Sequence, residues 1–236
     1  MKSETIDLGG WLCDEPDQKG ERECGEVAAL AGECDNLDAK TRLILTAERL
    51  FAQSGINGVS LRKIAQKAKL GNHFAVQYHF GSREGLVQAI FDHRMAQMEE
   101  ARGAMLEDLH RRGLTKDARS ILEVIFLPQL QLNGDGHASY GNFLAQYLLR
   151  NDWSDFGVFG HEAPPNLQKT FDLLRERVDY LPSAVAQRRL VNVSLMFLYL
   201  LVRHSGQGGG QQEAFDSALA DTMEQIVTAM CLPFRV

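Results

Sequence analysis

The chain has 236 residues, of which 44% are hydrophobic and 24% charged, and this balance is typical of a soluble globular protein. Its 21 glycines and 6 prolines exclude a collagen-like or low-complexity chain. Residues 1–12 lack the apolar run of a secretory signal, and the longest apolar stretch, 193–202, is too short to span a bilayer. We therefore expect a cytoplasmic protein that does not enter the membrane.

The cysteines predict neither disulfides nor a metal site. Cys13, Cys24 and Cys34 are spaced about ten residues apart, unlike the CxxC pairs of zinc sites. No histidine lies in this segment to complete a ligand set. We expect reduced thiols, no metal and no cofactor.

The net charge of −6 is unevenly distributed along the chain. Residues 1–39 carry a net charge of −8, residues 40–83 a net charge of +7, and residues 84–236 a net charge of −5. Eight bases and a single acid, Glu48, make up the central value. A compact basic segment in an acidic protein is typical of a phosphate-binding module, although a solvated basic face has the same composition.

Helical patterns begin after an acidic segment, 1–37, that lacks periodicity and that we interpret as a flexible tail. Asp38 is a suitable N-cap for a first helix, which Gly55 ends. Ser60 is the predicted cap of a short second helix, and a third short helix is predicted from about residue 73 to residue 79. After Gly81, residue Ser82 caps a long helix that extends to about residue 112.

The rest of the chain is also predicted to be helical, which makes the fold all-α. Helices are expected over 118–133, with a kink at Pro128, and over 139–151, 166–181, 184–204 and 212–231. Helix 184–204 is apolar around nearly its whole circumference, so we expect it to be covered on all sides. The predicted organisation is the tail 1–37, a three-helix domain at 38–83 and a second helical domain at 84–236.

Residues 60–80 have the features of a helix-turn-helix, in which the second helix enters the major groove of DNA. Polar side chains on that helix can contact the edges of DNA bases. The surrounding lysine, arginine and hydroxyl side chains can contact phosphates. Alternative interpretations are that His79 packs beside Phe80 and that Tyr78 covers the core. The candidate DNA-binding residues are Lys40, Arg42, Ser60, Arg62, Asn72, His73, Gln77, Tyr78, His79 and Arg83.

The segment 41–91 resembles the N-terminal DNA-binding domain of TetR-type transcriptional regulators. The resemblance rests on Ala47, Leu50 and Phe51 before Gly55, on the Val-Ser-Leu run at 59–61, and on the Tyr-His-Phe ending at 78–80 that precedes Ser-Arg-Glu at 82–84. By position, Tyr78 and His79 take the family's contacts at the end of the recognition helix, and Arg83 stands where lysine is usual. The resemblance implies a homodimeric regulator, usually a repressor, whose variable C-terminal domain binds a small effector.

A palindromic operator requires two DNA-binding domains about 34 Å or more apart, so we expect a dimer. Helices 184–204 and 212–231 are the candidate interface, although both could instead fill the core of one subunit. Helices between 86 and 200 are expected to enclose a hydrophobic or aromatic effector. The candidate ligand-binding residues are Phe126, Asn142, Phe143, Gln146, Tyr147, Phe171, Asn192, Met196 and Tyr199.

The predicted mechanism is that effector binding moves the long helix 82–112 and changes the distance between the two DNA-binding domains of the dimer. A second hypothesis is that the acidic tail competes with DNA for the basic segment. The sequence has no nucleophile elbow, Walker loop, HExxH or dinucleotide fingerprint, so no enzymatic function is predicted. A helical adaptor or ligand-binding protein that does not bind DNA is the alternative.

Overall fold

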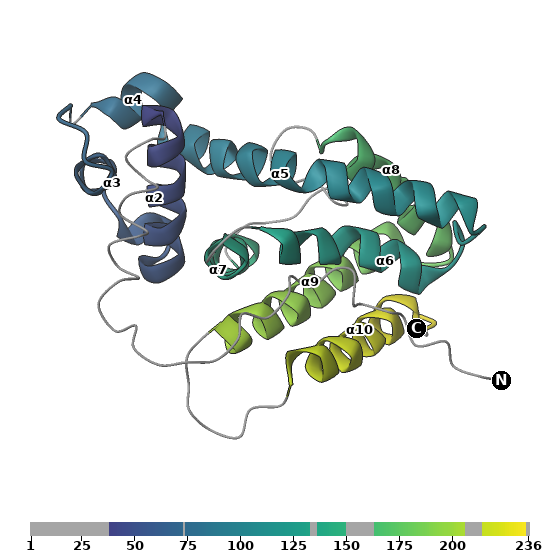
Figure 1. Ribbon diagram of the computed structural model, residues 1–236. Helices are drawn as coiled ribbons and strands as arrows, with labels where there is room; N and C mark the ends of the chain where they lie inside the picture. Colours follow the sequence, from purple (N-terminus) through teal and green to yellow (C-terminus); the bar gives the residue numbers. More distant parts are fainter. Residues whose placement is uncertain (1–37, 73, 133–135, 150–162, 206–213, 235–236) are drawn as a thin grey trace, which may run out of the picture. The chain divides into compact units, whose positions relative to one another are not determined.

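The computed structural model describes residues 38–72, 74–132, 136–149, 163–205 and 214–234, and these form helices and turns without a strand. The all-α prediction is therefore confirmed for this part of the chain. The predicted tail and His73 lie outside the described residues. Figure 1 shows the first three described helices, labelled α2, α3 and α4, at one end of the long helix α5.

The first helices begin and end where local side-chain chemistry predicts. The Asp38 carboxylate accepts a hydrogen bond from the Thr41 amide and caps α2 (Ala39–Ser54), which ends at Gly55 with φ 74°. The Ser60 hydroxyl accepts from the Lys63 amide and caps α3 (Leu61–Lys67), after the short 3-10 turn η2 (Ile56–Gly58). The third helix, α4 (Ala75–Phe80), begins later than predicted because Asn72 accepts a hydrogen bond from the Phe74 amide at 2.9 Å and holds a turn there.

The long helix α5 (Arg83–Arg111) starts at Ser82, whose hydroxyl accepts from the Gly85 amide. Pro128 ends the next helix, since α6 (Ala118–Phe126) passes into the 3-10 turn η3 (Leu127–Gln131) instead of continuing to residue 133. Later helices keep the predicted order with shifted ends. They are α7 (Gly136–Leu148), α8 (Pro165–Arg177), α9 (Ser183–Ser205) and α10 (Phe215–Cys231).

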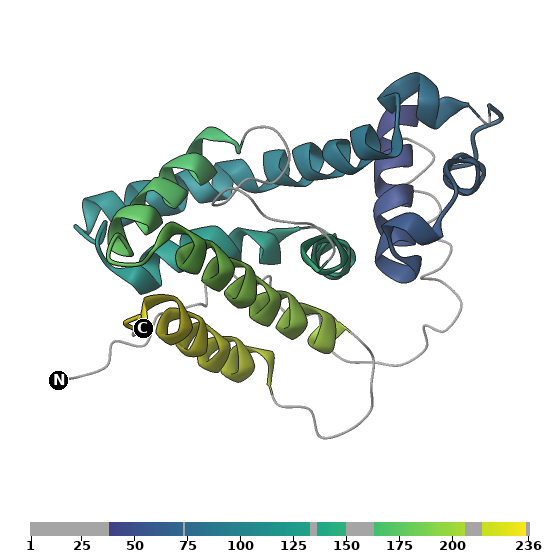
Figure 2. The same cartoon turned by 180° about the vertical axis from the view of Figure 1, so that it is seen from behind.

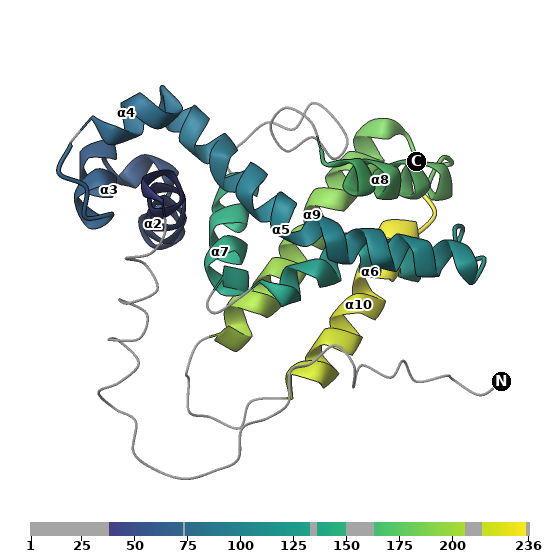
Figure 3. The ribbon, with the colours of Figure 1, turned by 45° about the horizontal axis from the view of Figure 1, so that its top comes forward.

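We call residues 38–82, with α2 to α4, the head, and the helices from α5 onward the body. Helix α2 packs against both α5 and α7, so the head and the body share a continuous core. In the body, α9 packs between α7 and α10, and Figure 2 shows α9 and α10 side by side from behind. Figure 3 shows α5 crossing from the head to the far end of the body.

Helix α9 is only partly covered by the described residues of the single chain. Tyr199 is 69% exposed and Asn192 is also exposed, whereas Val193 and Phe197 are fully buried. By length and composition α9 could cross a membrane, but half of its apolar window is already buried against its own chain. Helix α9 therefore has one face for the core and a second, partly apolar face that the described residues leave uncovered.

Candidate nucleic-acid interface

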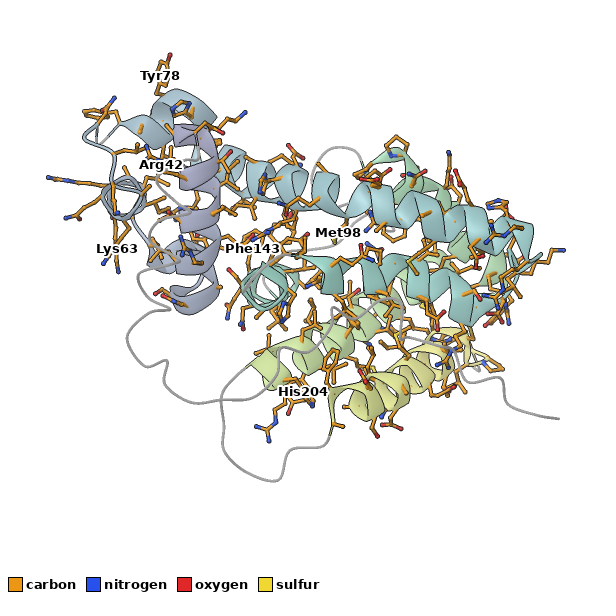
Figure 4. All side chains as sticks on the ribbon, viewed as in Figure 1. Arg42, Lys63, Tyr78, Met98, Phe143 and His204 are labelled. Atoms are coloured by element: carbon orange, nitrogen blue, oxygen red, sulfur yellow. The ribbon has the colours of Figure 1, made fainter. Side chains whose placement is uncertain are left out.

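Residues 40–83 expose lysine and arginine side chains and bury their single acid. Glu48 of α2 is fully buried, and its carboxylate accepts hydrogen bonds from Arg94 of α5 at 2.6 and 2.8 Å. Lys63 lies on the outer side of α3 in Figure 4. The exposed charge of residues 40–83 is therefore entirely positive, as a phosphate-binding surface requires. The exposed lysine and arginine residues of this segment are Lys40, Arg49, Arg62, Lys63, Lys67 and Lys69.

Helix α4 exposes the polar side chains that the sequence assigns to base and phosphate contacts. Gln77, Tyr78 and His79 are all exposed, and Tyr78, at 82%, projects outward from α4 in Figure 4. The Tyr78 and His79 rings meet edge to face, with centroids 5.0 Å apart. The opposite face of α4 buries Val76 in the core. A short helix with one buried face and one exposed polar face has the form needed to enter a major groove.

Two candidate residues hold the helix-turn-helix backbone. The Ser60 hydroxyl caps α3, and the Asn72 side-chain oxygen accepts from the Phe74 amide. Both residues are exposed, and each oxygen has a second lone pair that can accept a further hydrogen bond. Their first contribution is therefore to fix the turn that orients α4.

The candidate lysine and arginine residues of α2, α3 and α5 have different surroundings. Lys40 and Arg62 are exposed, whereas Arg42 is half-buried and its Nε atom is buried without a hydrogen-bond partner. Arg83 donates a hydrogen bond from Nη1 to the Ile56 carbonyl at 2.5 Å, and its guanidinium lies over the Phe51 ring. Arg83 thus ties the start of α5 to the head, a role that its position in the sequence does not reveal.

One exposed residue of the recognition helix is missing from the sequence-based set. Phe74, directly before α4, is 76% exposed, although phenylalanine is among the residues most often buried. Helical periodicity does not identify it, because it lies at the helix end, where the periodic pattern stops. Its spacing of four residues from Tyr78 is the sequence signal that could have found it.

The predicted ligand-binding residues divide between the interior and the surface. Phe143 is completely buried, and its ring lies 5.2 Å from Phe91 of α5 and 6.3 Å from Phe51 of α2. Tyr140 and Tyr147 of α7 complete this group, which we call the aromatic cluster. Phe143 is labelled beside α7 in Figure 4. The cluster joins the head to the body through three helices.

Other candidates are dispersed around the body. Phe126 is buried against Phe197, with ring centroids 5.1 Å apart, and Phe171 is buried in α8. Asn142, Gln146 and Met196 are half-buried.

Asn192 and Tyr199 lie on the face of α9 that the described residues leave exposed. All-round apolar character hid which side of α9 faces the core.

Arg102 is a buried cation that the sequence analysis did not select. Its side chain is 2% exposed, its Nη1 atom donates to Glu99 at 3.2 Å, and its Nε atom has no hydrogen-bond partner. Burial lowers the pKa of the Arg102 guanidinium, whereas Glu99 acts in the opposite direction. Burial likewise raises the pKa of the Tyr140 hydroxyl. The Arg102 Nε atom is therefore a buried donor in the body that could still form a hydrogen bond, as are Ser139 Oγ, Gln187 Nε2 and His204 Nε2.

Among the described residues, no group of three or more histidine, cysteine, aspartate or glutamate side chains could hold a metal ion. The arrangement instead consists of an exposed basic head and a body with a largely apolar interior. The basic head suits binding of an anionic polymer.

Comparison with known proteins agrees with this geometry. The family of bacterial regulatory proteins named tetR matches residues 43–90, which include α3, α4 and the first turns of α5. No curated protein matches the chain.

Fourteen chains of solved structures match. One of them comes from work on the molecular basis for control of antibiotic production by bacterial hormones. It is 19% identical, the match covers 80% of this chain and 96% of that one, and the TM-score is 0.44.

The matched segment contains both helices of the helix-turn-helix and the exposed residues Gln77, Tyr78 and His79. Residues 43–90 are therefore a TetR-family N-terminal DNA-binding domain, and the chain that carries them is a transcriptional regulator.

Proposed function

We propose that the protein is a cytoplasmic, homodimeric repressor that binds a palindromic operator and is released by a small hydrophobic or aromatic effector. The observation that carries the proposal is the head, in which every exposed charge of residues 40–83 is positive and α4 exposes Gln77, Tyr78 and His79. The proposal assigns binding functions to both parts of the chain and no catalysis.

The direct test is selection of bound sequences from random duplex DNA with the full chain. We expect a palindrome whose affinity falls steeply as salt increases, because Lys and Arg contacts release counterions from phosphates. Lys63→Gln should weaken binding similarly for all sequences and reduce the salt slope by about one. Lys169→Gln, an exposed change in α8, is the matched control. Negligible, salt-insensitive DNA binding would instead favour the helical adaptor.

The proposed dimer uses the uncovered face of α9 together with α10. Leu195 and Val202 are half-buried and Tyr199 is exposed on one side of α9, which is the pattern of a helix awaiting a second copy. Two such helices from each subunit would form a four-helix interface.

We expect Tyr199→Glu to convert the dimer to a monomer in light-scattering chromatography, because it places a charge in the apolar contact. Ala104→Glu, which adds the same charge to an exposed position of α5, should remain dimeric. A dimeric Tyr199→Glu variant would contradict the assignment of this face.

Release would depend on the connections between body and head. An effector inside the body changes the position of α5 or α7, and α2 follows because Glu48 binds Arg94 of α5 and Phe51 packs against Phe143 of α7. The distance between the two heads of the dimer then no longer fits successive major grooves. The effector shifts this equilibrium only as far as it binds the released state more tightly.

The interior also suggests the chemistry of the effector. The aromatic cluster favours an apolar or aromatic body, and the Arg102 Nε donor favours one acceptor oxygen on it. A thermal-shift screen followed by release from the selected operator tests this proposal. Stabilisation by highly charged metabolites alone would contradict it.

A further inference from the structure

Two aromatic rings stand on the solvent side of the recognition helix. Phe74 and Tyr78 are 76% and 82% exposed, and their spacing of four residues places them on one face of α4. The Tyr78 amide donates to the Phe74 carbonyl at 2.9 Å, which makes Phe74 part of the first turn. The two rings therefore form an exposed aromatic strip within a basic surface.

The position of Phe74 is fixed by local hydrogen bonds rather than by packing of its ring. The Asn72 oxygen accepts from the Phe74 amide, while the next two residues, Ala75 and Val76, are buried and anchor the helix. The other described phenylalanines of the head are Phe51, which is fully buried, and Phe80, which is half-buried. An exposed phenyl ring on a binding surface indicates a partner with an apolar group at that place.

The head already specifies the class of that partner, because its exposed charges are complementary to a nucleic-acid backbone. The N-terminal residues of a recognition helix approach base edges in the major groove. A phenyl ring has no hydrogen-bonding group, and the apolar group that the major groove offers is the C5-methyl of thymine. Tyr78 differs, since its hydroxyl can also bond a phosphate oxygen.

We propose that Phe74 is a specificity-determining residue that contacts the C5-methyl group of one thymine in each operator half-site. The proposal rests on the DNA-binding function proposed above. It adds a base preference that hydrogen-bonding residues of α4 do not account for.

Uracil replaces thymine without its methyl group and keeps the same pairing, so it isolates this contact. Each thymine of the selected operator is replaced singly by uracil, and the dissociation constant is measured at one fixed salt concentration. We expect one thymine per half-site at which binding by the full chain weakens about three- to fivefold, the value of one buried methyl group.

Phe74→Ala completes a double-mutant cycle. It should weaken binding to the thymine operator about tenfold or more and bind the thymine and uracil operators equally at that position. Tyr78→Phe, the control variant on the same strip, should keep the preference for thymine. Because the Phe74 ring is exposed, unchanged circular dichroism and thermal unfolding should confirm that Phe74→Ala folds.

Two outcomes overturn the inference: no thymine is sensitive to loss of its methyl, or Phe74→Ala retains the wild-type preference at the sensitive position. Sequence-selective binding with either outcome leaves the proposed DNA-binding function in place. Failure to select any DNA would instead refute that function together with this inference.

Discussion

Arg94→Met is expected to lower the free energy of unfolding by about 3–5 kcal/mol, because it leaves the Glu48 carboxylate buried without its partner. The two side chains are only 7% and 1% exposed. Arg94 donates to both Glu48 oxygens, at 2.6 and 2.8 Å, and its Nη1 atom donates to Gln97 at 2.9 Å. Because the site is enclosed, water cannot solvate the Glu48 carboxylate in place of Arg94 without a large free-energy cost.

The pair has structural significance because it connects α2 of the head with α5 of the body. A buried ion pair adds little net stability over an apolar pair of similar size, but breaking it is costly. The double variant Glu48→Met/Arg94→Met should therefore recover most of the stability lost in Arg94→Met. The difference between the single and double variants measures the coupling.

Urea unfolding of the four proteins in this cycle provides the measurement, and thermal unfolding should show a decrease of about 6–20 °C for Arg94→Met. Arg111→Met is the control, since Arg111 pairs with Asp108 on the exposed side of the same helix and its loss should cost less than about 1 kcal/mol. A loss below about 1 kcal/mol for Arg94→Met would show that Glu48 does not depend on this partner.

Local chemistry made the helix ends predictable. Asp38, Ser60 and Ser82 accept hydrogen bonds from amides three residues later, and Gly55 and Gly81 adopt positive φ angles, as helix starts and stops of these types require. Pro128 ends α6 for an equally local reason. Each of these features depends on residues within one turn of the chain, so the sequence contains all the information needed.

Features that depend on distant residues were not predictable. Glu48 and Arg94 are 46 residues apart, and periodicity places each on a helix face without showing that the faces meet. The same limit explains Asn192 and Tyr199, which belong to a helix whose apolar residues lie on nearly all sides. Arg83 was expected at phosphate because of its position, yet the Ile56 carbonyl lies within reach of its side chain.

The candidate DNA-binding site includes residues that local sequence predicts and one that depends on distant packing. Gln77, Tyr78 and His79 were identified because a short helix between predicted turns has one polar face. Phe74 was not, because exposure of an apolar residue depends on whether any part of the fold covers it. Three-dimensional packing decides whether an apolar residue is covered, and no described residue covers the Phe74 ring.

The second large effect is expected for Gly85→Ala, which should weaken operator binding about ten- to a hundredfold. Gly85 lies in the first turn of α5, where an added Cβ would be 2.1 Å from the Phe80 carbonyl oxygen and 3.2 Å from its carbon. Both are backbone atoms at the end of the recognition helix, so they cannot rotate away as a side chain would. Either α4 or the start of α5 has to move.

Movement of α4 has a direct consequence for DNA binding. Gln77 and Tyr78 belong to the last turns before Phe80, and hydrogen bonds to base edges weaken steeply with a displacement of a few tenths of an ångström. A well-formed contact to a base contributes about 1–3 kcal/mol, so loss of one or two accounts for the expected decrease. Stability should fall by only about 1–3 kcal/mol, because the strain is local and alanine favours the helix more than glycine does.

Gly103→Ala tests whether the effect depends on this contact or on glycine in α5 generally. Its added Cβ would lie 2.9 Å from Nδ2 of Asn166, the end of a side chain that can turn aside. We expect its operator affinity to equal that of the wild type in fluorescence anisotropy. Gly85→Ala with unchanged affinity would mean that the junction between α4 and α5 accommodates a methyl group without moving the recognition helix.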